Sequence, residues 1–144
     1  MARVKINLPD KFQFSTEMRV RVTDLNYGGH LGNDKFLSLI HEARMRFLQQ
    51  FGFSELNIEG VGLVVVDAVV VYKCEVFLSE VLTFEVAVDG INRNGCDFFF
   101  KISSKASGRE VARAKTGVVF FDFEKRRMVK TPQQFEAVFG PQNL

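Results

Sequence analysis

Tryptophan is absent from this sequence, and cysteine, histidine and proline are scarce. The 144 residues include two cysteines, two histidines and three prolines. Cys74 and Cys96 have neither the spacing of a metal-ligand set nor that of a redox motif. Because both lie in strand-like runs, we expect them to be small apolar residues of a protein in a reducing compartment.

A strong excess of one charge is also missing. The sequence has 19 basic and 17 acidic side chains, and its formal net charge is +2. This balance is too small to indicate a nucleic-acid partner, and the basic residues are scattered. Only the Lys-Arg-Arg run at 125–127 forms a cluster. We interpret it as a solvated turn, with a contact to an acidic cofactor as the alternative.

Long apolar runs are missing as well. The first nine residues lack the continuous apolar region of a signal peptide. The longest apolar run, residues 61–72, is too short for a membrane span and contains Asp67. We therefore expect a cytoplasmic protein with no membrane partner.

Several nucleotide, metal and nucleophile motifs are missing too. There is no phosphate-binding P-loop, no dinucleotide fingerprint, no metal-ligand cluster and no serine nucleophile elbow. These absences disfavour cofactor-dependent redox chemistry and serine-type hydrolysis, and we expect neither a cofactor nor a metal. A length of 144 residues with 47% hydrophobic content suits a single domain over 1–144.

The sequence does contain a clear succession of one strand, one long helix and several further strands. Alternation of apolar and polar residues predicts a strand over 12–23. Apolar residues at helical spacing predict a helix over 34–51, with Asn33 as its N-cap and Gly52 after its end. A short closing helix is predicted after Thr131-Pro132. The remaining predicted strands cover 63–76, 81–88, 98–104 and 111–123.

This order of elements predicts an α+β architecture. A single amphipathic helix cannot cover both faces of such a sheet. We therefore expect the sheet to wrap around the helix and to leave some of its surface for a partner. Sixteen phenylalanines supply bulky apolar surface for this purpose. A homo-oligomer is expected rather than a monomer.

The turn between the first strand and the helix concentrates polar side chains and glycines. Asp24, Asn26 and His30 lie here with the pair Gly28-Gly29. These side chains can position water, transfer protons or hold a polar ligand, and the glycines let backbone N–H groups approach a ligand closely. The helix start adds unpaired amides and a partial positive charge. The alternative is an Asx turn with a loop histidine bonded to a carbonyl, which needs no substrate.

Arg44 is predicted to lie inside the apolar stripe of the helix. Its guanidinium therefore needs a partner or a path to solvent, and Asp24 and Asp67 are the candidate partners. One interpretation is a buried Arg–Asp pair that fixes the helix against the sheet. The other makes Asp67, which interrupts a valine-rich run, a catalytic carboxylate in an apolar pocket, where burial would raise its pKa.

From about residue 12 to 123, the chain resembles the hotdog-fold acyl-CoA thioesterases of the 4-hydroxybenzoyl-CoA thioesterase type. The resemblance rests on the turn at 24–33, on His-Glu-Ala-Arg at 41–44, and on Tyr-Lys-Cys-Glu at 72–75 followed by Ser-Glu-Val-Leu at 79–82. It implies the hotdog fold, in which a five-stranded antiparallel sheet wraps a long helix. It also implies sheets paired edge to edge in dimers, active sites at the dimer interface, and a homodimer or homotetramer.

The resemblance further implies hydrolysis of an acyl-CoA or acyl carrier protein thioester to a free acid and a thiol, with CoA present only as part of the substrate. The amides of the helix start would hold the thioester carbonyl and stabilise the oxyanion. The substrate-binding residues implied are Gly29, Gly32 and Asn33, and the catalytic residues implied are Asp24, Asn26, His30 and Asp67. Asp24 or Asp67 would activate water, while Asn26 and His30 would orient the water or the carbonyl.

One position departs from the family pattern. The family's turn commonly reads Asp-x-Asp, and its second aspartate is the catalytic base or nucleophile. Asn26 holds that place here, and an amide cannot be a general base. The alternative function is therefore a hotdog protein that binds acyl-CoA without cleaving it.

Overall fold

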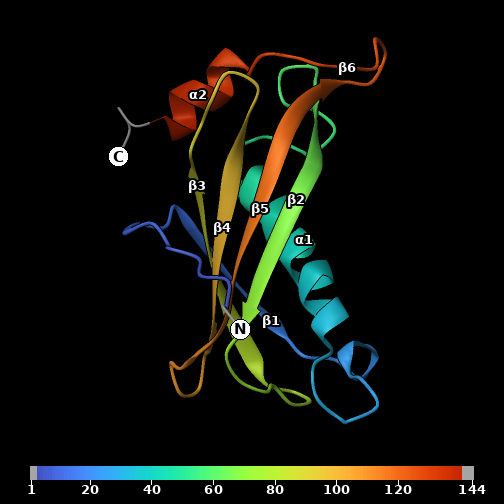
Figure 1. The fold of residues 1–144 in the computed structure, drawn as a ribbon, viewed down its shortest axis with the longest axis vertical. Coiled ribbons are helices and arrows are strands. Elements are labelled where there is room, and N and C mark those ends of the chain that lie inside the picture. Colours follow the sequence, from blue (N-terminus) through green and yellow to red (C-terminus); the bar gives the residue numbers. More distant parts are fainter. Residues whose placement is uncertain (1–2, 141–144) are drawn as a thin grey trace.

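In the computed structural model, which describes residues 3–140, a curved antiparallel sheet wraps around one long helix (Figure 1). The main strands lie in the order β1-β3-β4-β5-β2, and a two-residue strand, β6, pairs with β5. The strands are β1 (Phe14–Arg19), β2 (Gly62–Tyr72), β3 (Val81–Asp89), β4 (Gly95–Ser104), β5 (Glu110–Asp122) and β6 (Arg127–Met128). The helices are α1 (Asn33–Gln50), α2 (Gln133–Phe139) and the 3-10 turn η1 (Val22–Asp24). The predicted hotdog architecture is confirmed, and β6 is an addition to it.

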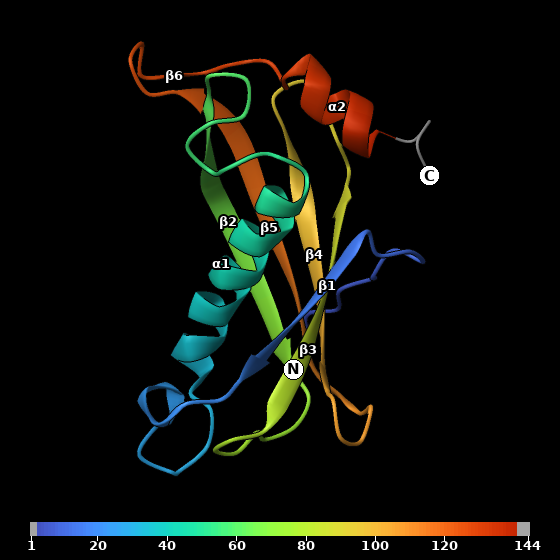
Figure 2. The ribbon, with the colours of Figure 1, turned by 180° about the vertical axis from the view of Figure 1, so that it is seen from behind.

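The apolar stripe of α1 packs into the concave face of the sheet (Figure 2). Phe47 is fully buried and contacts Phe98 of β4 edge-on, with ring centroids 5.9 Å apart. Side chains of β3 and β4 alternate between this core and the outer face, as expected for strands with one covered side. Among residues 3–140, no helix has both the length and the apolar composition needed to cross a membrane.

The start of α1 differs from the prediction by one residue. Asn33 is the first helical residue, and Gly32, with extended backbone angles, takes the N-cap position. The expected N-cap role of Asn33 is therefore wrong. Asp34 lies in the first turn, where its charge favours the helix dipole.

The first strand is shorter than the sequence pattern predicts. β1 ends at Arg19, and Val22–Asp24 form the 3-10 turn η1 instead of continuing the strand. Alternation alone could not detect this, because a 3-10 turn three residues long has no period of its own. Asp24 is therefore the last residue of η1 and does not belong to a strand.

Within the described residues, strand β2 forms an edge of the sheet and has β5 as its single partner strand. Its middle is unusually open for an apolar strand, since Val65 and Val66 are 44% and 59% exposed. A bulge between Val65 and Asp67 interrupts the register there. β2 ends at Tyr72, four residues before the predicted limit.

Arg44 is buried, as its place in the apolar stripe predicts, but its partner is neither candidate aspartate. Its Nε donates to Oε2 of Glu55, which lies in the loop between α1 and β2. Glu55 also contacts Nε2 of His41 at 2.7 Å. The expected Arg44–Asp pair is wrong, because sequence distance cannot show which loop carboxylate folds back onto the helix.

Candidate active site

The turn at residues 24–33 folds into a closed loop. Oδ1 of Asn26 accepts the backbone N–H of Gly28 at 2.8 Å and that of His30 at 3.4 Å. The backbone N–H of Asn26 donates to the carbonyl of His30 at 2.9 Å. Gly29 closes the loop with φ +81°, a conformation that favours glycine. The Asx-turn interpretation of Asn26 is therefore confirmed, and it fixes where the side chains of Asn26 and His30 point.

Asp24 is held by a neighbouring arginine. The residue is 2% exposed, and its carboxylate accepts the backbone N–H of Arg21 at 2.9 Å as well as two guanidinium N–H groups. Burial alone would raise the pKa of this carboxyl, but the hydrogen bonds and charge of Arg21 outweigh burial and lower it. Asp24 is thus an ionised group that ties η1 together.

Asp67 lies on the convex face of the sheet, opposite Gly117 of β5. Its Oδ1 accepts the ammonium of Lys115 at 2.8 Å and the backbone N–H of Gly117 at 2.9 Å. The hydrogen bond from Lys115 outweighs the small effect of burial and lowers the pKa of Asp67. The expectation of an apolar pocket with a raised pKa is wrong, because Asp67 follows the β-bulge and its side chain is half exposed.

A pocket of about 360 Å³ opens between the start of α1 and the end of β2. It brings three predicted site residues together: Asn26, His30 and Asn33. Neither Asp24 nor Asp67 lines it, and their predicted catalytic roles stay predictions. The full lining is Asn26, His30, Leu31, Asn33, Phe36, Tyr72, Lys73, Cys74 and Glu75.

The β2 side of this pocket was not among the predicted site residues. Tyr72 ends β2, and its hydroxyl donates to the carbonyl of Asn33 at 2.9 Å, which ties the strand end to the helix start. Burial and the nearby charge of Asp34 raise the pKa of Tyr72, so the hydroxyl keeps its proton. In the sequence, the change from valines to the polar run at 72–75 could have identified this side of the pocket.

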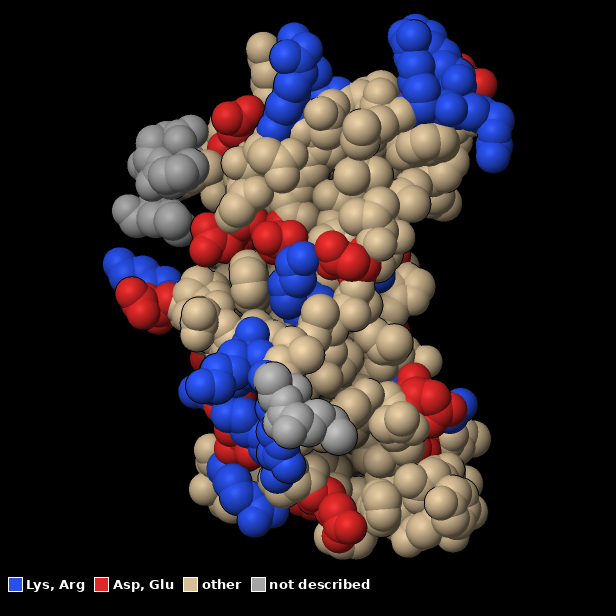
Figure 3. Space-filling model, in the orientation of Figure 1, with Lys and Arg blue, Asp and Glu red and all other residues tan. Residues whose placement is uncertain are grey.

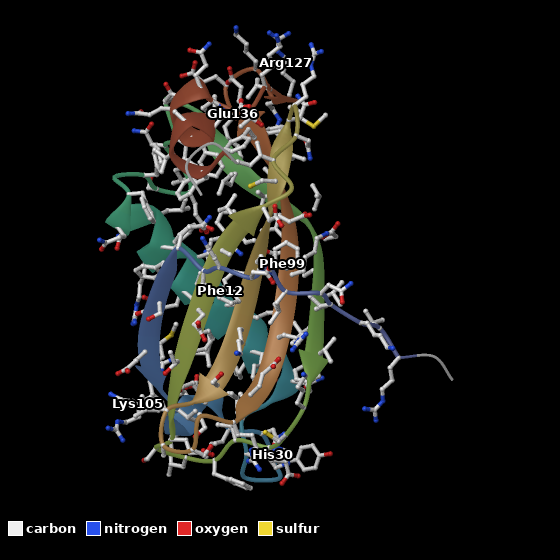
Figure 4. All side chains as sticks on the ribbon, turned by 90° about the vertical axis from the view of Figure 1, so that its left-hand side faces the viewer. Phe12, His30, Phe99, Lys105, Arg127 and Glu136 are labelled. Atoms are coloured by element: carbon white, nitrogen blue, oxygen red, sulfur yellow. The ribbon has the colours of Figure 1, made fainter. Side chains whose placement is uncertain are left out.

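Two backbone contacts fix the loop after β2 against the turn. The backbone N–H of Leu31 donates to the carbonyl of Val76 at 2.7 Å, and His30 forms an isolated antiparallel bridge with Phe77. As a result, Oε1 of Glu75 lies 3.7 Å from Nε2 of His30. Figure 4 shows His30 at the end of the molecule opposite Arg127, so the basic cluster at 125–127 lies far from this pocket.

Most amides predicted to hold the carbonyl are already engaged. Gly29 donates to the carbonyl of Asn26, Leu31 to that of Val76, and Gly32 to that of Asp24. Within residues 3–140, the N–H of Asn33 has no acceptor, and it lies at the positive end of the α1 dipole. This amide is the donor best placed to meet a ligand oxygen in the pocket.

Both signs of charge occur on the surface. On the face drawn in Figure 3, basic side chains gather at the upper right and along the lower left, acidic side chains lie beside and between them, and uncharged surface covers most of the rest. In the pocket, Lys73 is the lining ammonium, and its Nζ lies 3.4 Å from Oε2 of Glu110. The residues that the structure describes contain no cluster of histidine, cysteine and acidic side chains suited to a metal ion.

Comparison with known proteins gives a consistent result. The sequence model of the family described as "Thioesterase-like superfamily" matches residues 20–139. No curated protein matches the chain significantly. Among solved structures, a 1,4-dihydroxy-2-naphthoyl-CoA thioesterase from Synechocystis superposes with a TM-score of 0.82 at 22% identity, covering 91% of this chain and 98% of its own.

Two further structures share the fold at lower identity. A gentisyl-coenzyme A thioesterase gives a TM-score of 0.76 at 18% identity and covers 85% of this chain and 99% of its own. A DHNA-CoA thioesterase from Staphylococcus aureus gives 0.74 at 18% identity and covers 89% of this chain and 83% of its own. The similarity therefore extends over nearly the whole of each structure.

Proposed function

Because the chain belongs to the thioesterase-like superfamily, we propose that it hydrolyses an acyl-CoA or acyl carrier protein thioester in the pocket between α1 and β2. The observation that carries this proposal is the unengaged N–H of Asn33 at the start of α1, because Asn33 lines a pocket that has both polar and apolar walls. Water adds to the thioester carbonyl, and the carbon–sulfur bond then breaks to give the free acid and the thiol.

The helix start supplies the electrostatic part of this chemistry. When water attacks, negative charge develops on the carbonyl oxygen, and a preorganised N–H donor stabilises that charge. A well-placed donor of this kind contributes about 3–4 kcal/mol to the transition state. The Tyr72–Asn33 hydrogen bond and the Asn26 turn hold the donor in place before the substrate arrives.

The pocket walls suit a thioester with an acyl group of limited size. Leu31 and Phe36 supply apolar surface, and the Phe36 ring contacts that of Tyr72 edge-on at 5.2 Å. Two of the similar structures are named for aromatic acyl thioesters, 1,4-dihydroxy-2-naphthoyl-CoA and gentisyl-CoA. We therefore place aromatic acyl-CoAs in the first group of substrates to test.

The proposal also includes a second copy of the chain, paired through the edge strand β2. An edge strand with exposed valines and free backbone groups is a natural place for pairing with another strand. Antiparallel pairing of two β2 strands about their exposed middle would bring the loop before one β2 towards Tyr72 of the other copy. We propose a homodimer, or a homotetramer built from it, and light scattering of the purified protein would show a mass of two or four chains.

The alternative is a hotdog protein that binds acyl-CoA without turnover, and Asn26 is the observation that favours it. The deciding experiment measures binding and thiol release on the same samples, with short, medium and aromatic acyl-CoAs. Release of several thiols per protein chain supports hydrolysis. Tight binding with no release beyond the uncatalysed rate supports the binding function and contradicts ours.

A further inference from the structure

Glu75 is the carboxylate-bearing residue among those that line the pocket between α1 and β2. We propose that Glu75 is the general base of this site and that His30 positions it, an inference that rests on the proposed hydrolase function. The two residues are distant in sequence, since their numbers differ by 45. The fold brings them together.

The closeness of the two side chains follows from the backbone. The bridge between His30 and Phe77 and the bond from Leu31 to Val76 fasten the loop after β2 to the turn. Nε2 of His30 and Oε1 of Glu75 lie 3.7 Å apart, slightly beyond hydrogen-bond distance. A small side-chain rotation by Glu75 would close this gap or admit the attacking water.

His30 itself is held from two sides. The Phe77 ring contacts the imidazole edge-on at a centroid distance of 6.2 Å. On the other side lies Gly28, where a Cβ would be 3.2 Å from Nε2 of His30. A side chain at residue 28 would therefore crowd the imidazole and displace it by a few tenths of an ångström.

Glu75 differs from Asp24 and Asp67 in the groups that contact its carboxylate. Asp24 is bound to Arg21 and Asp67 to Lys115, so both are poor proton acceptors. Within residues 3–140, the carboxylate of Glu75 accepts no hydrogen bond, and its side chain is 66% exposed at the pocket wall. Among the neighbouring groups, Nε2 of His30 lies 3.7 Å from the carboxylate, whereas Lys73 contacts the carboxylate of Glu110 and the Cys74 thiol donates to the carbonyl of Glu110 at 3.7 Å.

The proposed step balances without a cofactor. Glu75 takes a proton from water while the water oxygen bonds to the thioester carbon, and the carbonyl electron pair moves to the oxygen facing Asn33. The tetrahedral intermediate then collapses, the carbon–sulfur bond breaks, and the proton held by Glu75 passes to the leaving thiolate. One thioester and one water give one acid and one thiol.

The test compares Glu75→Gln with Glu124→Gln. The second variant removes the same charge in the turn before β6, near Arg127 and at the other end of the molecule from His30 (Figure 4). We expect Glu75→Gln to lower kcat by about 10²-fold or more with KM changed by less than about threefold, and to abolish the acidic limb of the kcat/KM pH profile. Glu124→Gln should match the wild type in all three.

Chemical rescue separates base catalysis from a structural role. In Glu75→Ala, formate should enter the vacated space and restore part of the lost rate, in proportion to its concentration. Activity of Glu75→Gln within about twofold of the wild type, or a loss confined to KM, overturns the assignment of Glu75. If the wild type itself releases no thiol from any substrate, the hydrolase function fails first, so the two failures are distinguishable.

Discussion

Two glycine positions should respond to alanine in opposite ways. Gly28 does not adopt the left-handed backbone region, but a Cβ there would lie 3.2 Å from Nε2 of His30 and 3.3 Å from Oδ1 of Asn26. Gly52 has φ +83° after the end of α1 and open space around its Cβ position. Gly28→Ala should therefore displace side chains in the pocket without straining the backbone. Gly52→Ala should strain the backbone at a position far from the pocket.

The contact distances set the size of both effects. Contacts this short must relax by a few tenths of an ångström, so the imidazole and the Asn26 amide must shift by that amount. A displacement of 1 Å in an active site can cost about 10²-fold, so Gly28→Ala should lower kcat by about 10-fold. Its stability should be equal to the wild type or up to about 1 kcal/mol higher, because alanine reduces the entropy of the unfolded chain. Gly52→Ala should lose about 1 kcal/mol, or roughly 3 °C in Tm.

Thiol-release kinetics and thermal unfolding on the same preparations measure both quantities. Gly28→Ala and Gly52→Ala make the same chemical change at two places. Comparing them therefore separates an effect on kcat from an effect on stability. Wild-type kcat in Gly28→Ala would refute the placement of His30 and Asn26 in the working site. A loss of activity in Gly52→Ala as large as that in Gly28→Ala, at a temperature where both are folded, would refute it as well.

Three further predictions concern the carboxylates and the helix. Asn26→Asp keeps an oxygen that accepts the turn amides and adds a second oxygen at the pocket, so kcat should rise by about 10-fold. An unchanged rate would contradict the interpretation that residue 26 holds the place of the family's catalytic aspartate. Glu55→Gln leaves the buried Arg44 guanidinium without its charge partner and should cost about 3 kcal/mol in urea unfolding, against less than about 0.5 kcal/mol for the exposed Glu124→Gln. Asp24 has a lowered pKa in the folded protein, so its stabilising effect is complete above the unfolded value of about 3.9 and is lost as the pH falls through the folded value. The stability difference between wild type and Asp24→Asn should thus be about 1 kcal/mol at pH 7 and shrink below pH 4; a constant difference would argue against the Arg21 contact.

The architecture was predictable because its signals are long. The apolar stripe of α1 spans five turns, and the strands alternate over six to thirteen residues, so period and order together define the wrapped sheet. The boundaries were less predictable. At residues 22–24 a 3-10 turn replaces the strand end, and at residue 32 glycine takes the cap position expected for Asn33.

Part of the lining of the candidate pocket was also predictable, but the β2 side of the pocket was not. Asn26, His30 and Asn33 are close in sequence, so a local motif identifies them. Tyr72 and Glu75 reach the same pocket through the pairing of the loop after β2 with residues 30 and 31. The polar run at 72–75 is visible in the sequence, but no local pattern shows that this segment contacts the turn. The same reason explains why Glu55 rather than an aspartate neutralises Arg44.

The most direct test of this account is a crystal structure with an acyl-CoA analogue in which a methylene group replaces the thioester sulfur. We expect the carbonyl oxygen to lie about 2.7–3.1 Å from the backbone nitrogen of Asn33, with the acyl group against Leu31 and Phe36. A well-ordered analogue bound elsewhere on the protein, or bound in the pocket with its carbonyl pointing away from the start of α1, would show that Asn33 does not hold the thioester carbonyl.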